Sequence, residues 1–205
     1  EQSQHVRASL AGSILGLTPI FGSKLTVDHL LGLFLHLMRD ENAEVKLKLI
    51  ATVGELSSVV GIDVLSQSLL PSVRELSKDP QWRVRAAVID CMPGLAASLG
   101  EARFTAELQP LFAVWLTDPV YSVRSAVAAS CRRLSEALGA AWCERAVVPQ
   151  LAELLGHTSY LCRISAALCV GALAAVAGGA LLEGQLVPIV VRMSGDAVPN
   201  VRFNA

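Results

Sequence analysis

Residues 62–100 decide the fold and read IDVLSQSLLPSVRELSKDPQWRVRAAVIDCMPGLAASLG. The apolar residues of each half recur at the spacing of one helix face, first as Leu65, Leu69, Leu70, Val73 and Leu76, then as Val84, Val88, Ile89, Met92, Leu95 and Leu99. Pro71 lies inside the first helix and is expected to kink it, because proline lacks a backbone donor. Residues 78–81 form a turn signal between the helices. Gly100 stands where a left-handed helix cap is expected.

This layout repeats every 39 residues along the chain, without insertion. Glycine recurs at Gly22, Gly61, Gly100, Gly139 and Gly178, and proline at Pro71, Pro110, Pro149 and Pro188. A basic residue recurs at Arg7, Lys46, Arg85, Arg124, Arg163 and Arg202. An acid lies six positions earlier at Glu1, Asp40, Asp79, Asp118 and Asp196, whereas His157 interrupts the series. Because several residue types recur at the same interval of 39 residues, the sequence predicts a repeat protein.

The repeat predicts an all-α solenoid of stacked antiparallel helix pairs. One helical hairpin cannot bury its apolar stripe alone, so stacked neighbours form a continuous core. We expect complete repeats at 23–61, 62–100, 101–139 and 140–178, with partial repeats at 1–22 and 179–205. Neither end carries the polar capping repeat that solenoids need. We therefore expect the chain to be a portion of a longer array.

Composition fits many buried helix faces and excludes several classes of protein. Of the 205 residues, 53% are hydrophobic and 17% are charged, and the formal net charge is -1. Disorder needs lower hydrophobicity and more net charge, and a nucleic-acid module needs a basic surplus. The uncharged stretch at residues 164–182 approaches the length of a membrane span. It falls on the second helix and following turn of one repeat, so we expect no membrane segment.

No sequence motif indicates an enzyme, a metal site or a cofactor. The chain has no Gly-rich phosphate loop, no H-E-x-x-H and no G-x-S-x-G. The histidines His5, His29, His36 and His157 lack metal-ligand spacing. The five cysteines form no C-x-x-C, which is typical of a reduced intracellular chain. We predict no catalytic residue, no cofactor and no metal.

Aromatic residues recur at the turns between paired helices, which we call the corners. Trp82, Tyr121 and Tyr160 each lie three residues after the acid position. Neighbouring helix pairs stack roughly 10 Å apart, so three such rings would form a line roughly 20 Å long. Trp, Tyr and Arg are enriched in interface hot spots. The register predicts a binding ridge, which Arg83 and Arg163 would extend; the alternative is that each ring folds over its own hairpin.

The layout resembles HEAT repeats, and several segments resemble the scaffold (A, 65 kDa) subunit family of protein phosphatase 2A. The HEAT resemblance rests on the kinking prolines, the Asp-x-x-x-x-Val-Arg corner and the closing glycine. The closer resemblance rests on residues 65–71, 82–85, 115–118 and 193–204, together with Gln4-His5-Val6 and residues 29–35. It covers essentially the whole chain and corresponds to the C-terminal part of the scaffold.

The resemblance implies a non-catalytic scaffold that holds a phosphatase catalytic subunit through its corners. By position, the contacts would be Trp82, Arg83, Tyr121, Tyr160, Arg163, Val198 and Asn200. The family's ladder between repeats would consist of Asp40, Asp79, Asp118 and Asp196 with Lys46, Arg85, Arg124 and Arg202, and would be weaker at His157. A regulatory B-type subunit would bind mainly to repeats absent from this chain, giving a hetero-oligomer.

An alternative is another HEAT-repeat interaction scaffold, such as a transport receptor or a cytoskeletal or ciliary scaffold. A transport receptor is expected to carry acidic inner helices for basic cargo, and these helices are not acidic. Neither interpretation involves nucleic acid or a membrane. We expect a cytoplasmic protein, with the nucleus, cytoskeleton or cilium as further locations.

Overall fold

The computed structural model describes residues 3–205 and gives helices and turns throughout, with no strand among those residues. The side chain of Leu15 lies outside the description, as do Glu1 and Gln2 and thus the first acid of the predicted column. The chain divides into two compact units, with the boundary between Leu99 and Gly100.

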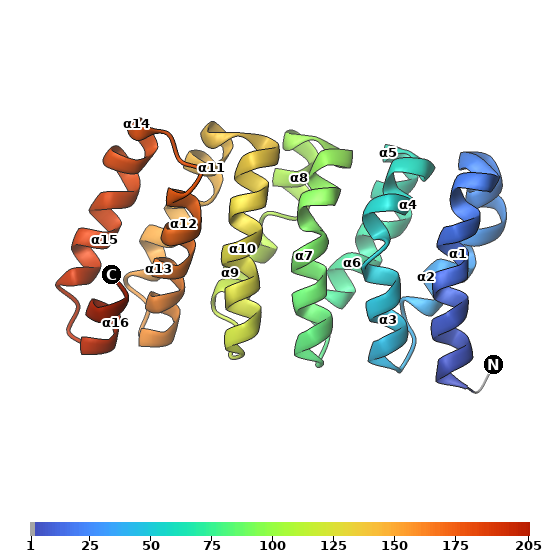
Figure 1. The fold of residues 1–205 in the computed structure, drawn as a ribbon, viewed down its shortest axis with the longest axis horizontal. Helices are drawn as coiled ribbons and strands as arrows, with labels where there is room; N and C mark the ends of the chain where they lie inside the picture. Colours follow the sequence, from blue (N-terminus) through green and yellow to red (C-terminus); the bar gives the residue numbers. More distant parts are fainter. Residues whose placement is uncertain (1–2) are drawn as a thin grey trace. The chain divides into compact units, whose positions relative to one another are not determined.

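In the first unit, the second helices of three repeats pack side by side (Figure 1). They are α1 (Gln4–Leu25), α3 (Ala43–Ile50) continued by α4 (Val53–Val60), and α7 (Trp82–Leu99). The first helices of the repeats are broken into short pieces. These are η1 (Thr26–Leu30) and α2 (Leu31–Leu37), then α5 (Ile62–Val64), η2 (Leu65–Leu69) and α6 (Leu70–Leu76).

The second unit repeats this arrangement with α10 (Tyr121–Leu138), α13 (Tyr160–Ala174) and α16 (Pro199–Asn204) as its second helices. Helix α13 packs against both α10 and α16. The first helices are α8 (Glu101–Glu107) and α9 (Leu111–Leu116), then α11 (Ala140–Ala146) and α12 (Val148–Leu154), then α14 (Gly179–Leu181), η3 (Leu182–Leu186) and α15 (Val187–Ser194).

The first helix of every repeat is interrupted near the proline column, as the sequence predicts. A π-helical turn precedes Pro71 and another precedes Pro188. Pro110 separates α8 from α9, and Pro149 lies in the first turn of α12. An equivalent π-helical turn, η1, forms where Gly32 replaces the proline. The helix can therefore be interrupted at this position without a proline, so we attribute the break to packing between the helices of the repeat.

Four of the five periodic glycines adopt a backbone that other residues avoid. Gly22, Gly61, Gly100 and Gly139 have φ of 67°, 84°, 75° and 89°. Their ψ values lie near 180°, in an extended region that is essentially restricted to glycine, rather than in the predicted left-handed cap. Gly178 departs from the pattern with φ -72° and ψ 162°.

The predicted apolar stripes are buried. All eleven apolar positions named for residues 62–100 lie in the core of the first unit, each no more than 4% exposed. In the second unit Phe104, Phe112, Trp115 and Trp142 form a buried aromatic cluster with edge-to-face contacts. The indole of Trp142 also donates to Thr105 Oγ1 at 2.9 Å. Burial of stacked faces explains the high hydrophobic fraction.

The apolar stretch at residues 164–182 is not one helix, because α13 ends at Ala174 and a turn precedes α14. Across residues 3–205 no single helix is long and apolar enough to cross a membrane. The segments Gln4–Ile14 and Gly16–Leu37 meet the length and composition requirement only as a pair, which is bent by 61°.

Candidate functional site: the corner residues

Each corner is shaped by a side chain that accepts a hydrogen bond from the backbone two residues later. The Oδ1 atoms of Asp40, Asp79, Asp118 and Asp196 each accept such a bond at 2.8 Å. At the fifth corner His157 Nδ1 takes this role and accepts from the Ser159 N–H at 3.1 Å. The histidine thus reproduces the turn but brings no carboxylate.

In the first unit, corner acids also bind the basic residue of the preceding repeat. Arg7 binds Asp40 through Nε at 2.6 Å and Nη2 at 3.0 Å. Lys46 Nζ lies 2.6 Å from Asp79 Oδ2. The two acid side chains are 6% and 5% exposed, so these pairs are largely shielded from solvent. The hydrogen bond from Arg7 is the main reason that the pKa of Asp40 lies below its usual value.

In the second unit, the same geometry joins α13 to the last corner. Arg163 binds Asp196 through Nε at 2.7 Å and Nη2 at 2.9 Å, while its Nη1 donates to the His157 carbonyl at 2.8 Å. The hydrogen bond from Arg163, followed by that from the Val198 N–H, lowers the pKa of Asp196. One guanidinium therefore fixes its own corner and ties it to the next.

The contact between repeats at His157 differs because, among residues 3–205, no carboxylate lies opposite Arg124. Arg124 is buried, at 4% exposure. Its Nη1 donates to the Asp118 carbonyl at 2.7 Å, as in other corners, but its Nε donates to Ser165 Oγ at 3.0 Å. Ser165 in turn donates to the Leu161 carbonyl. A neutral hydroxyl thus replaces the acid, a substitution that sequence reasoning missed.

The corner aromatics differ in how far they reach into solvent. In the second unit Tyr121 and Tyr160, at the starts of adjacent helices α10 and α13, are 57% and 40% exposed. Leu161 beside Tyr160 is 42% exposed and adds apolar surface. The 39-residue spacing does not identify Leu161 as a contact residue. Its position outside the apolar stripe of its helix is the one sequence signal that it is exposed. Tyr121 and Tyr160 therefore form an exposed edge of this unit, which we call the tyrosine edge.

The remaining predicted contact residues occupy three kinds of position. In the first unit Trp82 is half-buried, and the guanidinium of Arg83 lies 5.2 Å from its ring centroid. In the second unit Val198 is half-buried and Asn200 is exposed. Arg163 is engaged with Asp196, and its side chain is only 12% exposed. The predicted alignment of Trp82 with the two tyrosines spans both units and stays a prediction.

The described residues offer little for chemistry. No group of three His, Cys, Asp or Glu side chains in residues 3–205 could hold a metal ion. The five cysteines are free thiols, and four of them are buried. Burial raises the pKa of the Cys143 thiol to about 11, which disfavours the reactive thiolate.

Comparison with known proteins gives one family match and short sequence relatives. Residues 23–100 match the family model described as PPP2R1A-like HEAT repeat. Over 53 residues the chain is 42% identical to the beta isoform of the 65 kDa A-type regulatory subunit of serine/threonine-protein phosphatase 2A from Mus musculus, and equally to that from Homo sapiens. These matches cover 26% of this chain and only 9% of the length of those relatives.

Solved structures share the fold at low sequence identity. The MAST/Orbit N-terminal domain matches with a TM-score of 0.61 and 20% identity, over 83% of this chain and 78% of that one. An engineered protein matches with a TM-score of 0.57 and 12% identity, over 100% and 90% of the two chains. The fold class is therefore the all-α HEAT-repeat solenoid, and residues 23–100 are similar to PPP2R1A-like HEAT repeats.

Proposed function

We propose that this chain is a non-catalytic scaffold that holds the catalytic subunit of a phosphatase 2A-type enzyme along its corners and coordinates it with a regulatory subunit. The observation that carries the proposal is the pair of exposed tyrosines on adjacent helices, at 57% and 40% exposure. Similarity to a phosphatase 2A regulatory subunit supports the choice of partner. The protein would act in the cytoplasm, and also in the nucleus or on cytoskeletal or ciliary structures.

The corners suit this role because their backbone is fixed by hydrogen bonds within each repeat. Arg124 and Arg163 each donate to a carbonyl of their own corner, so the tyrosines start helices of defined position. A rigid aromatic anchor loses little conformational freedom on binding. Exposed tyrosines in such a setting belong to a residue type that is enriched among interface hot spots.

The proposal is tested by measuring binding of purified phosphatase 2A catalytic subunit to this chain by calorimetry. Tyr121→Ala and Tyr160→Ala should each weaken binding about tenfold, since hot-spot truncations cost roughly 1–2 kcal/mol. Trp82→Ala with Tyr121→Ala tests the ridge in both units. Val114→Ala, at an equally exposed apolar position on α9, is the matched control and should change nothing.

Two results would count against the proposal. Absence of binding by the folded chain would favour the second candidate, another HEAT-repeat interaction scaffold with a different partner. Binding that survives both tyrosine substitutions unchanged would refute the tyrosine edge as the docking surface while leaving the partner in place.

A further inference from the structure

A small apolar groove lies between α9 and α12 in the second unit, beside the corner at His157. Its volume is about 180 Å³, and its lining residues come from the two helices and the turns that follow them: Ala113, Leu116, Thr117, Gln150, Glu153, Leu154 and His157. Pockets for small-molecule ligands usually measure about 300–1,000 Å³. A protein cavity of about 150 Å³ accommodates benzene. The groove therefore suits a single side chain of a partner rather than a cofactor.

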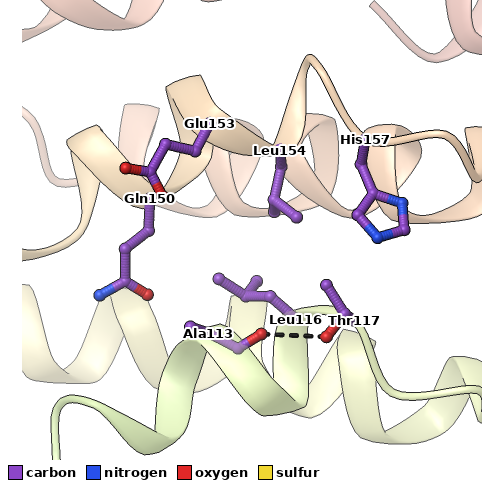
Figure 2. Close-up of a pocket in the computed structure, with 7 residues that line it drawn as sticks. All are labelled: Ala113, Leu116, Thr117, Gln150, Glu153, Leu154 and His157. Atoms are coloured by element: carbon purple, nitrogen blue, oxygen red, sulfur yellow. Dashed lines mark hydrogen bonds between the residues drawn. The ribbon is translucent and has the colours of Figure 1, made fainter.

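The groove combines apolar walls with acceptors at one end. Figure 2 shows Gln150 and Glu153 together on one side of Leu154, and His157 opposite Thr117 on the other side. Leu116 and Leu154 are buried and supply the walls. An occupant with an aliphatic stem and a terminal hydrogen-bond donor would match this arrangement.

Neither side-chain acceptor at that end has a partner within residues 3–205. Glu153 makes no ion pair within residues 3–205, and its side chain is exposed. Gln150 donates through Nε2 to the Ala146 carbonyl, which fixes the direction of its amide, and its Oε1 is buried with no hydrogen-bond partner among those residues. A buried acceptor without a donor costs about 1–3 kcal/mol, so a donor that reaches it on a small rotation of the amide would be favoured.

The first unit contains an equivalent groove that an arginine lines, and the side chain of this arginine is 64% exposed. Two periods earlier the positions of Thr117, Glu153 and His157 are held by Arg39, Glu75 and Asp79, which line an equivalent groove. There Arg39 Nε lies 3.3 Å from Glu75 Oε2. The second unit keeps the acid as Glu153 but has threonine in place of arginine. The chain thus supplies the guanidinium in one groove and lacks it in the other.

We propose that the groove between α9 and α12 binds an arginine side chain from a partner protein. The aliphatic stem would pack on Leu116 and Leu154, and the guanidinium would donate to Glu153 and Gln150, as Arg39 does to Glu75. The planar guanidinium, with its five donors, suits two acceptors better than an ammonium group does. This site is separate from the tyrosine edge and does not depend on the phosphatase proposal.

The test is an NMR titration of the whole chain with N-acetyl-arginine N-methylamide. Amide signals of Thr117, Gln150, Glu153 and His157 should shift in a saturable way. The uncharged isostere N-acetyl-citrulline N-methylamide should bind more weakly, and Glu153→Gln should weaken arginine binding about two- to fivefold, the effect of an exposed ion pair. Glu144→Gln removes the same charge from an exposed position on α11 and should have no effect.

A second variant makes the experiment decisive. Thr117→Arg introduces the residue found in the first unit, so its guanidinium should pair with Glu153, as Arg39 pairs with Glu75, and weaken probe binding about two- to fivefold while the spectrum remains that of a folded chain. Tyr121→Ala should leave probe binding unchanged, which separates this site from the tyrosine edge. Three results would each overturn the proposal: equal binding of the citrulline probe, unchanged binding of the arginine probe to Thr117→Arg, or no saturable shift at the groove.

Discussion

Replacing His157 with aspartate is expected to stabilise the second unit, because it would restore the missing acid opposite Arg124. Arg163 shows the geometry to be recovered, with Nε and Nη2 on the two oxygens of Asp196 at 2.7 and 2.9 Å. Arg124 already donates its Nη1 to its own corner in the same way. Aspartate would also keep the bond from the Ser159 N–H that His157 now accepts, as the other corner acids do.

The expected gain in the free energy of unfolding is about 1–2 kcal/mol. Hydrogen bonds to charged groups contribute about 1.5–3 kcal/mol, and Arg124 is already buried, so its desolvation is not a new cost. We reduce this range to about 1–2 kcal/mol because His157 is half-buried and solvent screens the new carboxylate. For a chain of this length the melting temperature would rise by about 2–4 °C for each kcal/mol.

The assay is urea unfolding of the wild type, His157→Asp and the matched control His157→Asn, which accepts the Ser159 bond without a charge. The unfolding free energy of His157→Asp should exceed that of His157→Asn by about 1–2 kcal/mol. The pKa of the new acid should be lowered by folding, as it is for Asp40 and Asp196. The gain is therefore present above the unfolded pKa of about 3.9 and is lost as pH falls through the folded pKa. Equal stability of the two variants at neutral pH would refute the reasoning.

Three further predictions concern single positions. Gly139→Ala should cost about 1–3 kcal/mol of unfolding free energy because its φ is 89°, whereas Gly178→Ala, at φ -72°, should cost nothing; urea midpoints that fall equally would contradict this. Ser165→Ala should lower the unfolding free energy of the wild type by about 1–3 kcal/mol, because Arg124 loses an acceptor. The same substitution should cost much less in the His157→Asp background, where the new carboxylate accepts from Arg124. A double-mutant cycle measures this difference. The Cys143 thiol, buried and with a pKa of about 11, should react with iodoacetamide at pH 8 far more slowly in the folded chain than in urea, and equal rates would show that the site opens readily.

The sequence predicts most of this fold because the same helix–turn–helix pattern recurs every 39 residues. Residues 62–100 already define two helices, and every apolar position named there is buried. The proline column correctly predicts where the first helices break. It fails to predict the break at η1, where Gly32 stands, since that interruption arises from packing between helices.

Local exceptions and side-chain partners are harder to predict from sequence. The glycine column is uniform in sequence, yet Gly178 has an ordinary backbone because the conformation depends on how the preceding helix ends. The acid column shows that Arg124 lacks its partner, but not that Ser165 replaces it, because the serine lies 41 residues away on another helix. Exposure of Tyr121 and Tyr160 fits their position at the corners. The groove beside Glu153 is harder to predict, because it depends on how α9 and α12 pack.

The serine opposite Arg124 has a consequence for how the second unit responds to its surroundings. In a repeat protein, stability is the sum of each repeat's own contribution and the coupling to its neighbours. The coupling through Arg163 and Asp196 uses a titratable anion, so acid and concentrated salt weaken it. The coupling through Arg124 and Ser165 contains no group that acid can neutralise. Within this unit, acid therefore weakens the Arg163–Asp196 pair, whereas the hydrogen bond between Arg124 and Ser165 is not affected.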